Sequence, residues 1–363
     1  MDEVIVLPTV NPDVRLISLV DALRGEGFSR IVVVDDGSDG SSQGLFICLG
    51  TRGCTVVHHT ANRGKGAAIK TGIMAARNLY PHSPAIITVD DDGQHDPADV
   101  ASVARASEDD PAALILGCRD LKASSVPAKS RLGNAFSSTF FRLDTGVRCS
   151  DTQTGLRAIP NGMWTEALDT PGERYEYEMN LLTRVAKEGG PLACVPIATI
   201  YVDDNRASHF DPIRDSCRIY ASFIRFATAS MACAAVDLGL FATIVALAPL
   251  DTALSAAVAT FVARMASGLI NFGLNKRWSF RAGGQTHRQA MRYAALFLAQ
   301  MSVSAGLVTL LSYAPIPLLA SKVLVDSGLF VVSYFLQRNW VFNGSDGKRC
   351  EEALDAHGQM ARQ

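Results

Sequence analysis

Short apolar runs alternate with amphipathic stretches along residues 1–212 of the chain. Runs rich in β-branched residues predict strands at residues 4–7, 31–34, 55–58, 85–89 and 113–116. Apolar residues at helical spacing predict helices at residues 13–24 and 66–79. Apolar strands separated by helices are typical of a mostly parallel sheet covered on both faces. Because such a sheet binds ligands where its strands end, the residues that follow each strand are the candidates for function.

Four longer apolar stretches follow this region, at residues 226–250, 254–275, 293–313 and 316–337. Each is close to the ~20 residues that cross a bilayer as a helix. One such stretch could be the core helix of a soluble protein. Four in succession, joined by short loops, predict a membrane domain of four transmembrane helices.

Lysine and arginine flank these stretches unevenly. They precede the first stretch, separate the second from the third and follow the fourth, as Arg214, Arg218, Arg225, Lys276, Arg277, Arg281, Arg288, Arg292, Arg338, Lys348 and Arg349. The loops at residues 249–251 and 314–315 carry none. The positive-inside rule therefore predicts a multi-pass protein of the plasma membrane with both termini and the middle loop in the cytosol.

Two features inside the apolar region predict how its helices meet. Asp237 and Arg264 fall near the middle of neighbouring stretches, where an unpaired charge costs on the order of 3 kcal/mol, so we expect them to pair. Residues 271–280 echo residues 333–342, each ending a stretch with basic and aromatic residues. This weak repeat predicts two tandem helical hairpins.

Composition narrows the class of protein. Only 19% of the 363 residues are charged, which favours a membrane protein, and a formal net charge of −2 gives no reason to expect a nucleic-acid partner. The eight cysteines form no C-x-x-C pair, which argues against a zinc ribbon or a disulfide framework and fits a reducing compartment. The N-terminus lacks the pattern of a signal peptide.

Polar motifs stand at the ends of four predicted strands. They are Pro8-Thr9, Asp35-Asp36-Gly37-Ser38, Asn62-Arg63-Gly64-Lys65-Gly66 and Asp90-Asp91-Asp92-Gly93-Gln94-His95. Each alone could be an ordinary turn, but their recurrence at successive strand ends predicts one ligand site. The dinucleotide pattern G-x-G-x-x-G is absent after the first strand, and Ile69 replaces the second glycine of a P-loop, so both of those nucleotide classes are disfavoured.

The three consecutive aspartates predict a metal site. If the chain stays extended after the fourth strand, Asp90, Asp92 and Gln94 point to one side. Hard oxygen ligands of this kind suit Mg²⁺ or Mn²⁺, completed by a substrate diphosphate. The alternative is a solvated acidic loop.

These motifs resemble glycosyltransferase family 2, and more narrowly its polyprenyl-phosphate (dolichyl-phosphate mannose synthase-like) branch. The resemblance implies an α/β GT-A fold and continues through Arg119, Arg131, residues 151–157 and residues 205–210. The apolar region resembles the GtrA-like domain of four transmembrane helices, although more loosely. We therefore expect a cytosolic GT-A domain at residues 1–212, a basic juxtamembrane helix at 213–225, a GtrA-like domain at 226–344 and a disordered cytosolic tail at 345–363.

The resemblance also implies a division of roles. The metal, Mg²⁺ or Mn²⁺, would be held by Asp90, Asp92 and Gln94. The nucleotide-sugar donor would contact Pro8, Thr9, Asp36, Lys65, Asp90 and Asp91. The catalytic set would be Asp90, Asp92, Asp151, Arg119 and Arg131, with Asp151 or Asp91 open as a proton acceptor.

An acceptor phosphate approaching a donor diphosphate needs further cations, and arginine binds phosphate in bidentate fashion. We expect the acceptor phosphate to contact Arg119, Arg131, Arg206, Ser208 and His209. The alternative is that these basic residues only anchor the domain to lipid. Glu176 and Glu178, at the start of a predicted helix, either contact the sugar or stabilise the helix N-terminus.

The predicted function is metal-dependent, inverting transfer of a hexose from a UDP- or GDP-sugar to polyprenyl phosphate at the cytosolic membrane face. One alternative is transfer to a protein or a growing glycan. The other is a translocator of lipid-linked sugar with a non-catalytic first domain. The sequence leaves several properties open. They are the sugar, the nucleoside diphosphate, the glycan pathway, a role of the membrane domain beyond anchoring, and a homo-oligomeric state.

Overall fold

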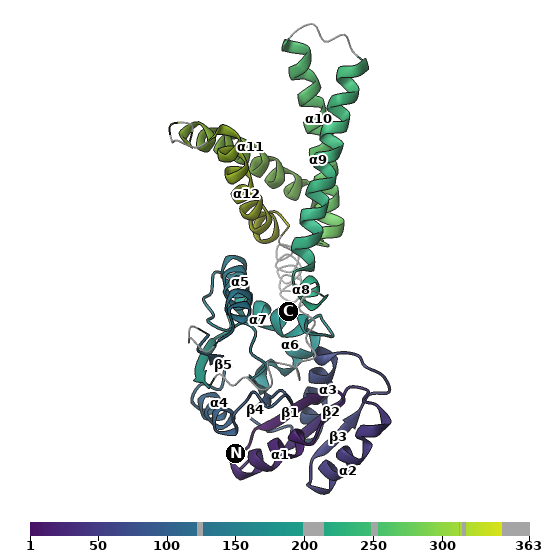
Figure 1. Ribbon diagram of the computed structural model, residues 1–363, viewed down its shortest axis with the longest axis vertical. Coiled ribbons are helices and arrows are strands. Elements are labelled where there is room, and N and C mark those ends of the chain that lie inside the picture. Colours follow the sequence, from purple (N-terminus) through teal and green to yellow (C-terminus); the bar gives the residue numbers. More distant parts are fainter. Residues whose placement is uncertain (122–125, 199–213, 248–252, 312, 314–316, 343–363) are drawn as a thin grey trace, which may run out of the picture. The chain divides into compact units, whose positions relative to one another are not determined.

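The chain forms two compact units, Met1–Ile219 and Tyr220–Gln363 (Figure 1). The computed structural model describes residues 1–121, 126–198, 214–247, 253–311, 313 and 317–342. The predicted tail at 345–363 lies outside these residues. In place of one juxtamembrane helix at 213–225, the first unit ends with a short helix, α8 (Arg214–Ile219), and the second begins with a long one, α9 (Ala221–Leu247).

The first unit contains a seven-stranded sheet of order β3-β2-β1-β4-β6-β5-β7. Its strands are β1 (Val4–Thr9), β2 (Ile31–Asp35), β3 (Thr55–His58), β4 (Ala85–Thr88), β5 (Leu114–Arg119), β6 (Arg157–Pro160) and β7 (Leu192–Ile197). Only β6 runs antiparallel to its neighbours, β4 and β5. The sheet is therefore mostly parallel, as predicted.

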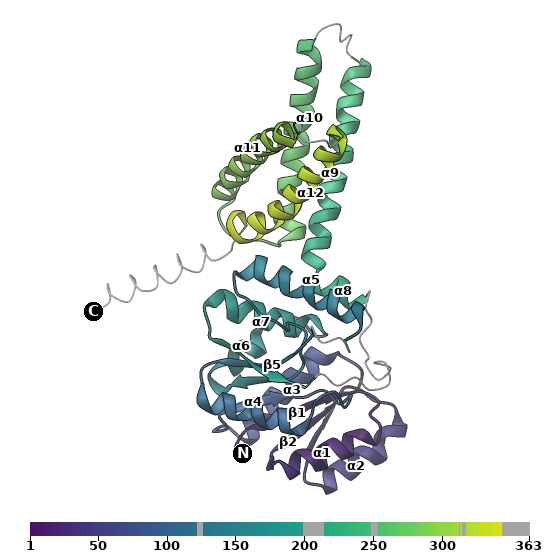
Figure 2. The same cartoon turned by 60° about the vertical axis from the view of Figure 1, so that its left-hand side comes forward.

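Helices cover both faces of this sheet (Figures 1 and 2). They are α1 (Arg15–Gly25), α2 (Gln43–Thr51), α3 (Lys65–Leu79), α4 (Pro97–Asp109), α5 (Ala128–Thr145), α6 (Trp164–Asp169) and α7 (Glu176–Glu188), while the short helix α8 packs against α7. One hydrophobic core joins the sheet to α1, α2 and α4, and a second joins it to α3, α5, α6 and α7. Because both faces are buried, the central strands β1, β2 and β4 are apolar at nearly every position. These strands could therefore be predicted from the sequence as continuous apolar runs.

The second unit consists of two helical hairpins (Figure 2). Its helices are α9 (Ala221–Leu247), α10 (Ala253–Leu274), α11 (Thr286–Leu311) and α12 (Leu318–Leu336). Within the described residues, α9 and α11 are long and apolar enough to cross a membrane. A total of four spans stays a prediction.

The predicted ion pair between Asp237 and Arg264 is confirmed. Arg264 Nε lies 3.5 Å from Asp237 Oδ2, which joins α9 to α10. Ser267 Oγ donates to the other oxygen, Asp237 Oδ1, at 3.1 Å. The carboxylate therefore has partners on the facing helix, as a charge at membrane depth requires.

The internal repeat has a structural counterpart at the ends of α10 and α12. Each helix continues into one π-helical turn, η4 (Asn275–Ser279) or η5 (Gln337–Val341). Asn275 and Gln337 occupy equivalent repeat positions, and Asn275 Nδ2 donates to Gln337 Oε1 at 3.0 Å in a buried site. The equivalent rings of Phe280 and Phe342 stack with centroids 5.3 Å apart. The two hairpins thus meet along residues that correspond in the repeat.

Candidate active site

The motifs that end β1, β2 and β4 meet the N-terminus of α3 around one pocket. Its lining residues are Pro8, Thr9, Val10, Asp36, Asn62, Gly64, Lys65, Ala68, Asp90, Asp91, Asp92, Arg174 and Tyr175. All six residues predicted to contact the donor are among them. The carboxyl ends of neighbouring parallel strands lie at the same edge of the sheet, and this is why motifs far apart in sequence converge here.

Asp36 organises the loop that leads into α3. Its carboxylate accepts hydrogen bonds from the backbone N–H groups of Arg63 and Gly64, at 2.9 and 2.7 Å, and lies 2.7 Å from His59 Nδ1. Gly64 has φ +108°, and a Cβ there would overlap Arg174, so only glycine fits. The Asp36 side chain is buried, and its observed role is to fix the loop that presents Lys65.

Lys65 lies between two carboxylates. Its Nζ is 2.7 Å from Asp90 Oδ1 and 3.0 Å from Glu178 Oε2. Burial lowers the pKa of Lys65, but the charges of Asp90 and Glu178 outweigh burial and raise it above its ordinary value. Lys65 is therefore a fixed positive charge in the pocket. Burial likewise raises the pKa of Asp90, but the charge of Lys65 and the nearby His95 ring outweigh burial, so the pKa lies well below its usual range.

The segment after β4 is a turn, which corrects the extended conformation assumed from the sequence. β4 ends at Thr88, residues 91–93 turn, and Gly93 has φ +76°. Asp92 Oδ1 accepts from the backbone N–H of Gln94 at 3.0 Å, an Asx-type turn that aspartate before glycine favours. The alternation that put Asp90, Asp92 and Gln94 on one side therefore does not apply.

The charges of the pocket nevertheless fit a divalent cation. Four carboxylates line it, from Asp36, Asp90, Asp91 and Asp92, against the two cations of Lys65 and Arg174. Burial, and then the negative charge of Asp90, raise the pKa of Asp92. A hard cation would relieve this repulsion, and carboxylate oxygens are the ligands that Mg²⁺ and Mn²⁺ prefer. Within the described residues, no group of three or more His, Cys, Asp or Glu side chains is placed so that it could hold a metal ion by itself, so substrate oxygens would have to complete the ligand set.

Thr9 and Asp91 connect the first strand to this turn, because Thr9 Oγ1 donates to Asp91 Oδ2. The His95 ring lies on the other side of the turn, with Nε2 3.7 Å from Asp90 Oδ2. These contacts hold the acidic turn at both ends.

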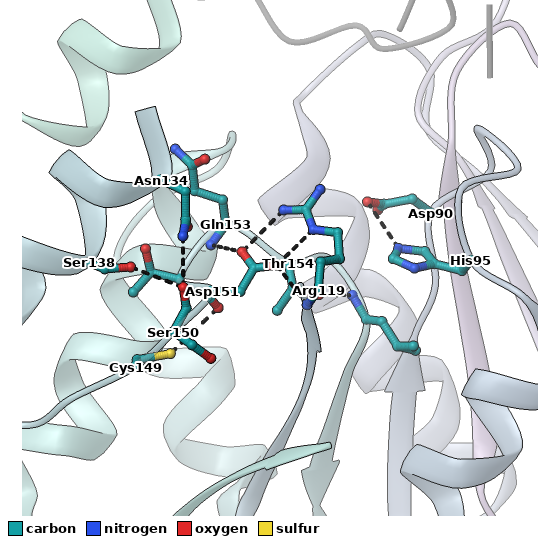
Figure 3. A network of polar contacts seen from close by, with 12 residues as sticks. Asp90, His95, Arg119, Asn134, Ser138, Cys149, Ser150, Asp151, Gln153 and Thr154 are labelled. Atoms are coloured by element: carbon teal, nitrogen blue, oxygen red, sulfur yellow. Dashed lines mark hydrogen bonds and ion pairs between the residues drawn. The ribbon is translucent and has the colours of Figure 1, made fainter. Parts of the chain in front are cut away.

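Arg119 and Asp151 form a second charged group, shown in Figure 3. Arg119 Nε and Nη2 donate to the two oxygens of Asp151 at 2.7 and 3.1 Å, in a bidentate pair. Asp151 is fully buried and also accepts from the N–H of Gln153 at 3.1 Å. Both oxygens of Asp151 are therefore engaged in hydrogen bonds. This geometry favours a role in positioning the Arg119 side chain and disfavours the role of proton acceptor for Asp151.

The two charged groups adjoin. The loop after Asp151 passes directly against Asp90, because a Cβ built on Gly155 would overlap Asp90 Oδ2. Thr88 Oγ1 donates to the carbonyl of Gly155 at 2.7 Å and holds the loop there. A group bound near Asp90 is therefore close to the loop that carries Asp151.

The two glutamates at the start of α7 have different roles. Glu176 Oε1 accepts from the backbone N–H groups of Glu173 and Arg174, at 3.1 and 3.3 Å, and so stabilises the helix start. Glu178 holds Lys65 through Oε2, while no described residue hydrogen-bonds its buried Oε1. Glu176 Oε2 is likewise buried without a hydrogen-bond partner among the described residues, but of the two glutamates it is Glu178 that contacts Lys65 of the pocket, which makes Glu178 the better candidate for a sugar hydroxyl.

The remaining acceptor residues are less defined. Arg131 lies exposed on α5. Arg206, Ser208 and His209 fall outside the described residues. Their predicted contacts with an acceptor phosphate stay predictions.

Sequence reasoning missed part of the site. Arg174 and Tyr175 line the pocket but lie in a loop before α7 with no strand-end pattern. Arg157, a buried residue of β6, donates to the carbonyls of Thr154 and Glu178 at 2.9 and 2.5 Å, so it ties the Asp151 loop to α7. Arg157 ends the 151–157 segment that carries the family resemblance, but the resemblance implied no role for it.

The chain is similar in sequence to known protein families in both of its units. Residues 4–157 match glycosyl transferase family 2, and residues 225–342 match the GtrA/DPMS transmembrane domain. An uncharacterized protein of Methanocaldococcus jannaschii is 33% identical over 207 residues, which cover 56% of this chain and 83% of that protein. The UDP-N-acetylglucosamine–dolichyl-phosphate N-acetylglucosaminyltransferase of Methanococcus voltae is 26% identical over 221 residues, 56% of this chain and 87% of that enzyme. Among solved structures, glucosyl-3-phosphoglycerate synthase of Mycobacterium tuberculosis has a TM-score of 0.46 at 17% identity, covering 61% of this chain and 76% of its own.

Proposed function

The chain belongs to glycosyl transferase family 2 and carries a GtrA/DPMS transmembrane domain, and on this premise we propose that it transfers a hexose from a nucleotide-sugar to polyprenyl phosphate. The observation that carries the proposal is the convergence of four strand-end motifs on one acidic pocket around Lys65. The similarity to a dolichyl-phosphate glycosyltransferase supports a lipid phosphate as the acceptor. The membrane domain would keep the enzyme where such lipids are found.

On the donor side, the pocket binds a nucleoside diphosphate. The loop that Asp36 fixes supplies Asn62 and Lys65, and Lys65 neutralises charge on the leaving diphosphate. Thr9 and Asp91 line the same pocket. Glu178 Oε1 accepts a hydroxyl of the sugar.

A divalent cation, Mg²⁺ or Mn²⁺, would be held by Asp90 and Asp92, with Gln94 beside them, and would supply electrostatic stabilisation of the diphosphate. It would also balance the pocket's charge, because the four carboxylates exceed the two cations by two. Asp90 stays ionised for this role, since its pKa lies below its usual range under the influence of Lys65.

On the acceptor side, Arg119 meets the lipid phosphate. Asp151 engages Nε and Nη2 and fixes the plane of the guanidinium, which suits phosphate recognition. A phosphate oxygen forms the new bond to the anomeric carbon while the bond from that carbon to the diphosphate breaks. Attack from the side opposite the leaving group inverts the anomeric carbon. A phosphate monoester, with its second pKa near ~6, is largely ionised at neutral pH, so the attack needs no strong base.

The test is transfer of radiolabelled sugar, from a panel of UDP- and GDP-sugars, to undecaprenyl phosphate by membranes containing the protein. The expected product is a lipid-soluble sugar phosphate that mild acid hydrolyses. Label in protein or in polymeric glycan would support the other acceptor classes. Binding of lipid-linked sugar without transfer from any donor would support a translocator and overturn the proposal.

A further inference from the structure

The two cations of the pocket differ in what already neutralises them. Lys65 lies between the carboxylates of Asp90 and Glu178, at 2.7 and 3.0 Å, and only 15% of its side chain is exposed. Arg174 lines the same pocket, and its Nη1 donates to a neutral group, Asn62 Oδ1, at 3.3 Å. Arg174 forms no ion pair with any residue that the structure describes. An anion that enters the pocket therefore meets the charge of Arg174 without a carboxylate beside it.

The backbone of Arg174 is fixed against the start of α3. The N–H of Ala67 donates to the carbonyl of Glu173 at 2.9 Å, and the N–H of Arg174 donates to Glu176 Oε1 at 3.3 Å. A Cβ on Gly66 would lie 2.9 Å from the carbonyl oxygen of Arg174, so the two segments pack backbone to backbone. The side chain thus starts from a fixed point, while its guanidinium is oriented by a contact with a neutral amide. A phosphate can compete with such a contact, because hydrogen bonds between charged groups are stronger than neutral ones.

We propose that Arg174 binds the diphosphate of the donor, an assignment that rests on the proposed function of the pocket. Arginine suits this role because its planar guanidinium presents parallel N–H groups to phosphate oxygens and keeps its proton. The charge of the pocket points the same way. A divalent metal ion would balance the excess of carboxylates, and the diphosphate then adds negative charge that needs a cation of its own.

The proposal divides the electrostatic work between the two cations. Lys65 is enclosed by Asp90, Glu178 and the ring of Tyr175, whose centroid lies 5.8 Å from Lys65 Nζ. The two carboxylates cancel part of the attraction of Lys65 for a phosphate. Arg174 reaches the pocket from the loop before α7, and no described carboxylate cancels its charge. Arg174 would therefore supply much of the affinity of the protein for a nucleoside diphosphate.

The experiment is calorimetric titration of the full-length protein in detergent, with Mn²⁺ present and without an acceptor lipid. UDP and GDP are both titrated, and the one that binds more tightly is used for the variants. Arg174→Gln removes the charge but keeps an amide, and it should weaken nucleoside diphosphate binding at least about tenfold, as expected for the loss of a hydrogen-bonded charge. Arg174→Lys keeps the charge without the planar fork, so its affinity should lie between those of the wild type and Arg174→Gln.

Arg63→Gln is the matched control, because Arg63 follows Asn62 but lies 3.9 Å from Glu173 and is not among the residues that line the pocket. Its affinity should stay within about twofold of the wild type. Unchanged affinity in Arg174→Gln, equal weakening in Arg63→Gln, or binding by Arg174→Lys as weak as that by Arg174→Gln would each overturn the proposal. Failure of the wild type to bind either nucleotide would overturn this proposal and the proposed function together. Binding that depends on Arg174, in a protein that transfers no sugar to undecaprenyl phosphate, would support the role of Arg174 and overturn only the lipid acceptor.

Discussion

Lys65 illustrates how single residues set the chemistry of the pocket. Two carboxylates hold its ammonium at 2.7 and 3.0 Å, so the charge is fixed in place before any ligand arrives. A preorganised charge of this kind costs no reorganisation during reaction. The same carboxylates make the pocket acidic, and an anionic diphosphate would be repelled without a further cation.

Asp92→Asn tests that cation directly. Removing one carboxylate should weaken Mn²⁺ binding at least tenfold and lower transfer about 100-fold, or ~2.7 kcal/mol in the barrier. Mn²⁺ binding is followed by electron paramagnetic resonance and transfer by the radiolabel assay. Asp110→Asn, at an exposed residue beyond α4, is the control and should change neither. Unchanged Mn²⁺ affinity in Asp92→Asn would remove Asp92 from the metal site.

The pH dependence of metal binding follows from the same residue. Burial and the charge of Asp90 raise the pKa of Asp92, so protons compete with the cation from a higher pH than at an ordinary carboxylate. Mn²⁺ affinity should therefore fall as pH decreases toward that raised pKa. In Asp92→Asn the decrease should be shallower, which titration calorimetry at several pH values would measure.

Glu178→Gln separates a sugar contact from a structural role. If Glu178 Oε1 accepts a sugar hydroxyl, nucleotide-sugar should bind about tenfold more weakly, since a hydrogen bond to a charged group is worth ~1.5 kcal/mol or more. Free nucleoside diphosphate, which lacks the sugar, should bind as before. Calorimetry with both ligands gives the comparison. Glu176→Gln is the matched control, with a nearly unchanged ratio of the two affinities. Equal weakening of both ligands by Glu178→Gln would leave Glu178 only the role of holding Lys65.

At the scale of elements, the continuous apolar strands could be predicted because burial on both faces leaves a simple pattern. β6 could not, since its four residues include an arginine and a proline, and its antiparallel pairing depends on strands distant in sequence. The turn at Asp91–Gly93 was missed for a local reason: Asx hydrogen bonding and a positive φ at glycine took precedence over strand continuation. The site residues in irregular loops, Arg174 and Tyr175, carry no periodicity that could have revealed them.

The join between the two membrane-domain hairpins gives an element-scale prediction. Asn275→Leu or Gln337→Leu alone leaves one buried amide without its partner on the other hairpin, although it keeps its hydrogen bonds within its own hairpin, whereas the double variant removes both amides. The sum of the two decreases in unfolding free energy in the single variants should therefore exceed the decrease in the double variant, with a coupling energy of ~0.5–1.5 kcal/mol. Unfolding in detergent measures the four free energies of the cycle. Strict additivity would show that the contact does not couple the two hairpins.

At the scale of the whole molecule, two sequence halves of different composition became two compact units. Their compositions predicted this, because a sheet-forming half with polar strand ends and an apolar half need different surroundings. Within the apolar region, the few polar residues still allowed contacts to be predicted. The Asp237–Arg264 ion pair is confirmed, and the repeat has its counterpart in the two π-helical turns.

Membrane topology is the prediction that joins these units to function. Asp251→Cys, between the first two predicted spans, should react with an impermeant maleimide added to intact cells, whereas His287→Cys, in the first turn of α11 next to the middle loop, should react only after permeabilisation. Peptide mass spectrometry locates each label, so native Cys217 serves as an internal standard that stays unlabelled until the cells are opened. Labelling of His287→Cys in intact cells, with Cys217 protected, would contradict four spans with cytosolic termini. The orientation matters because nucleotide-sugars are cytosolic metabolites, and a donor pocket on the other face would have no substrate to bind.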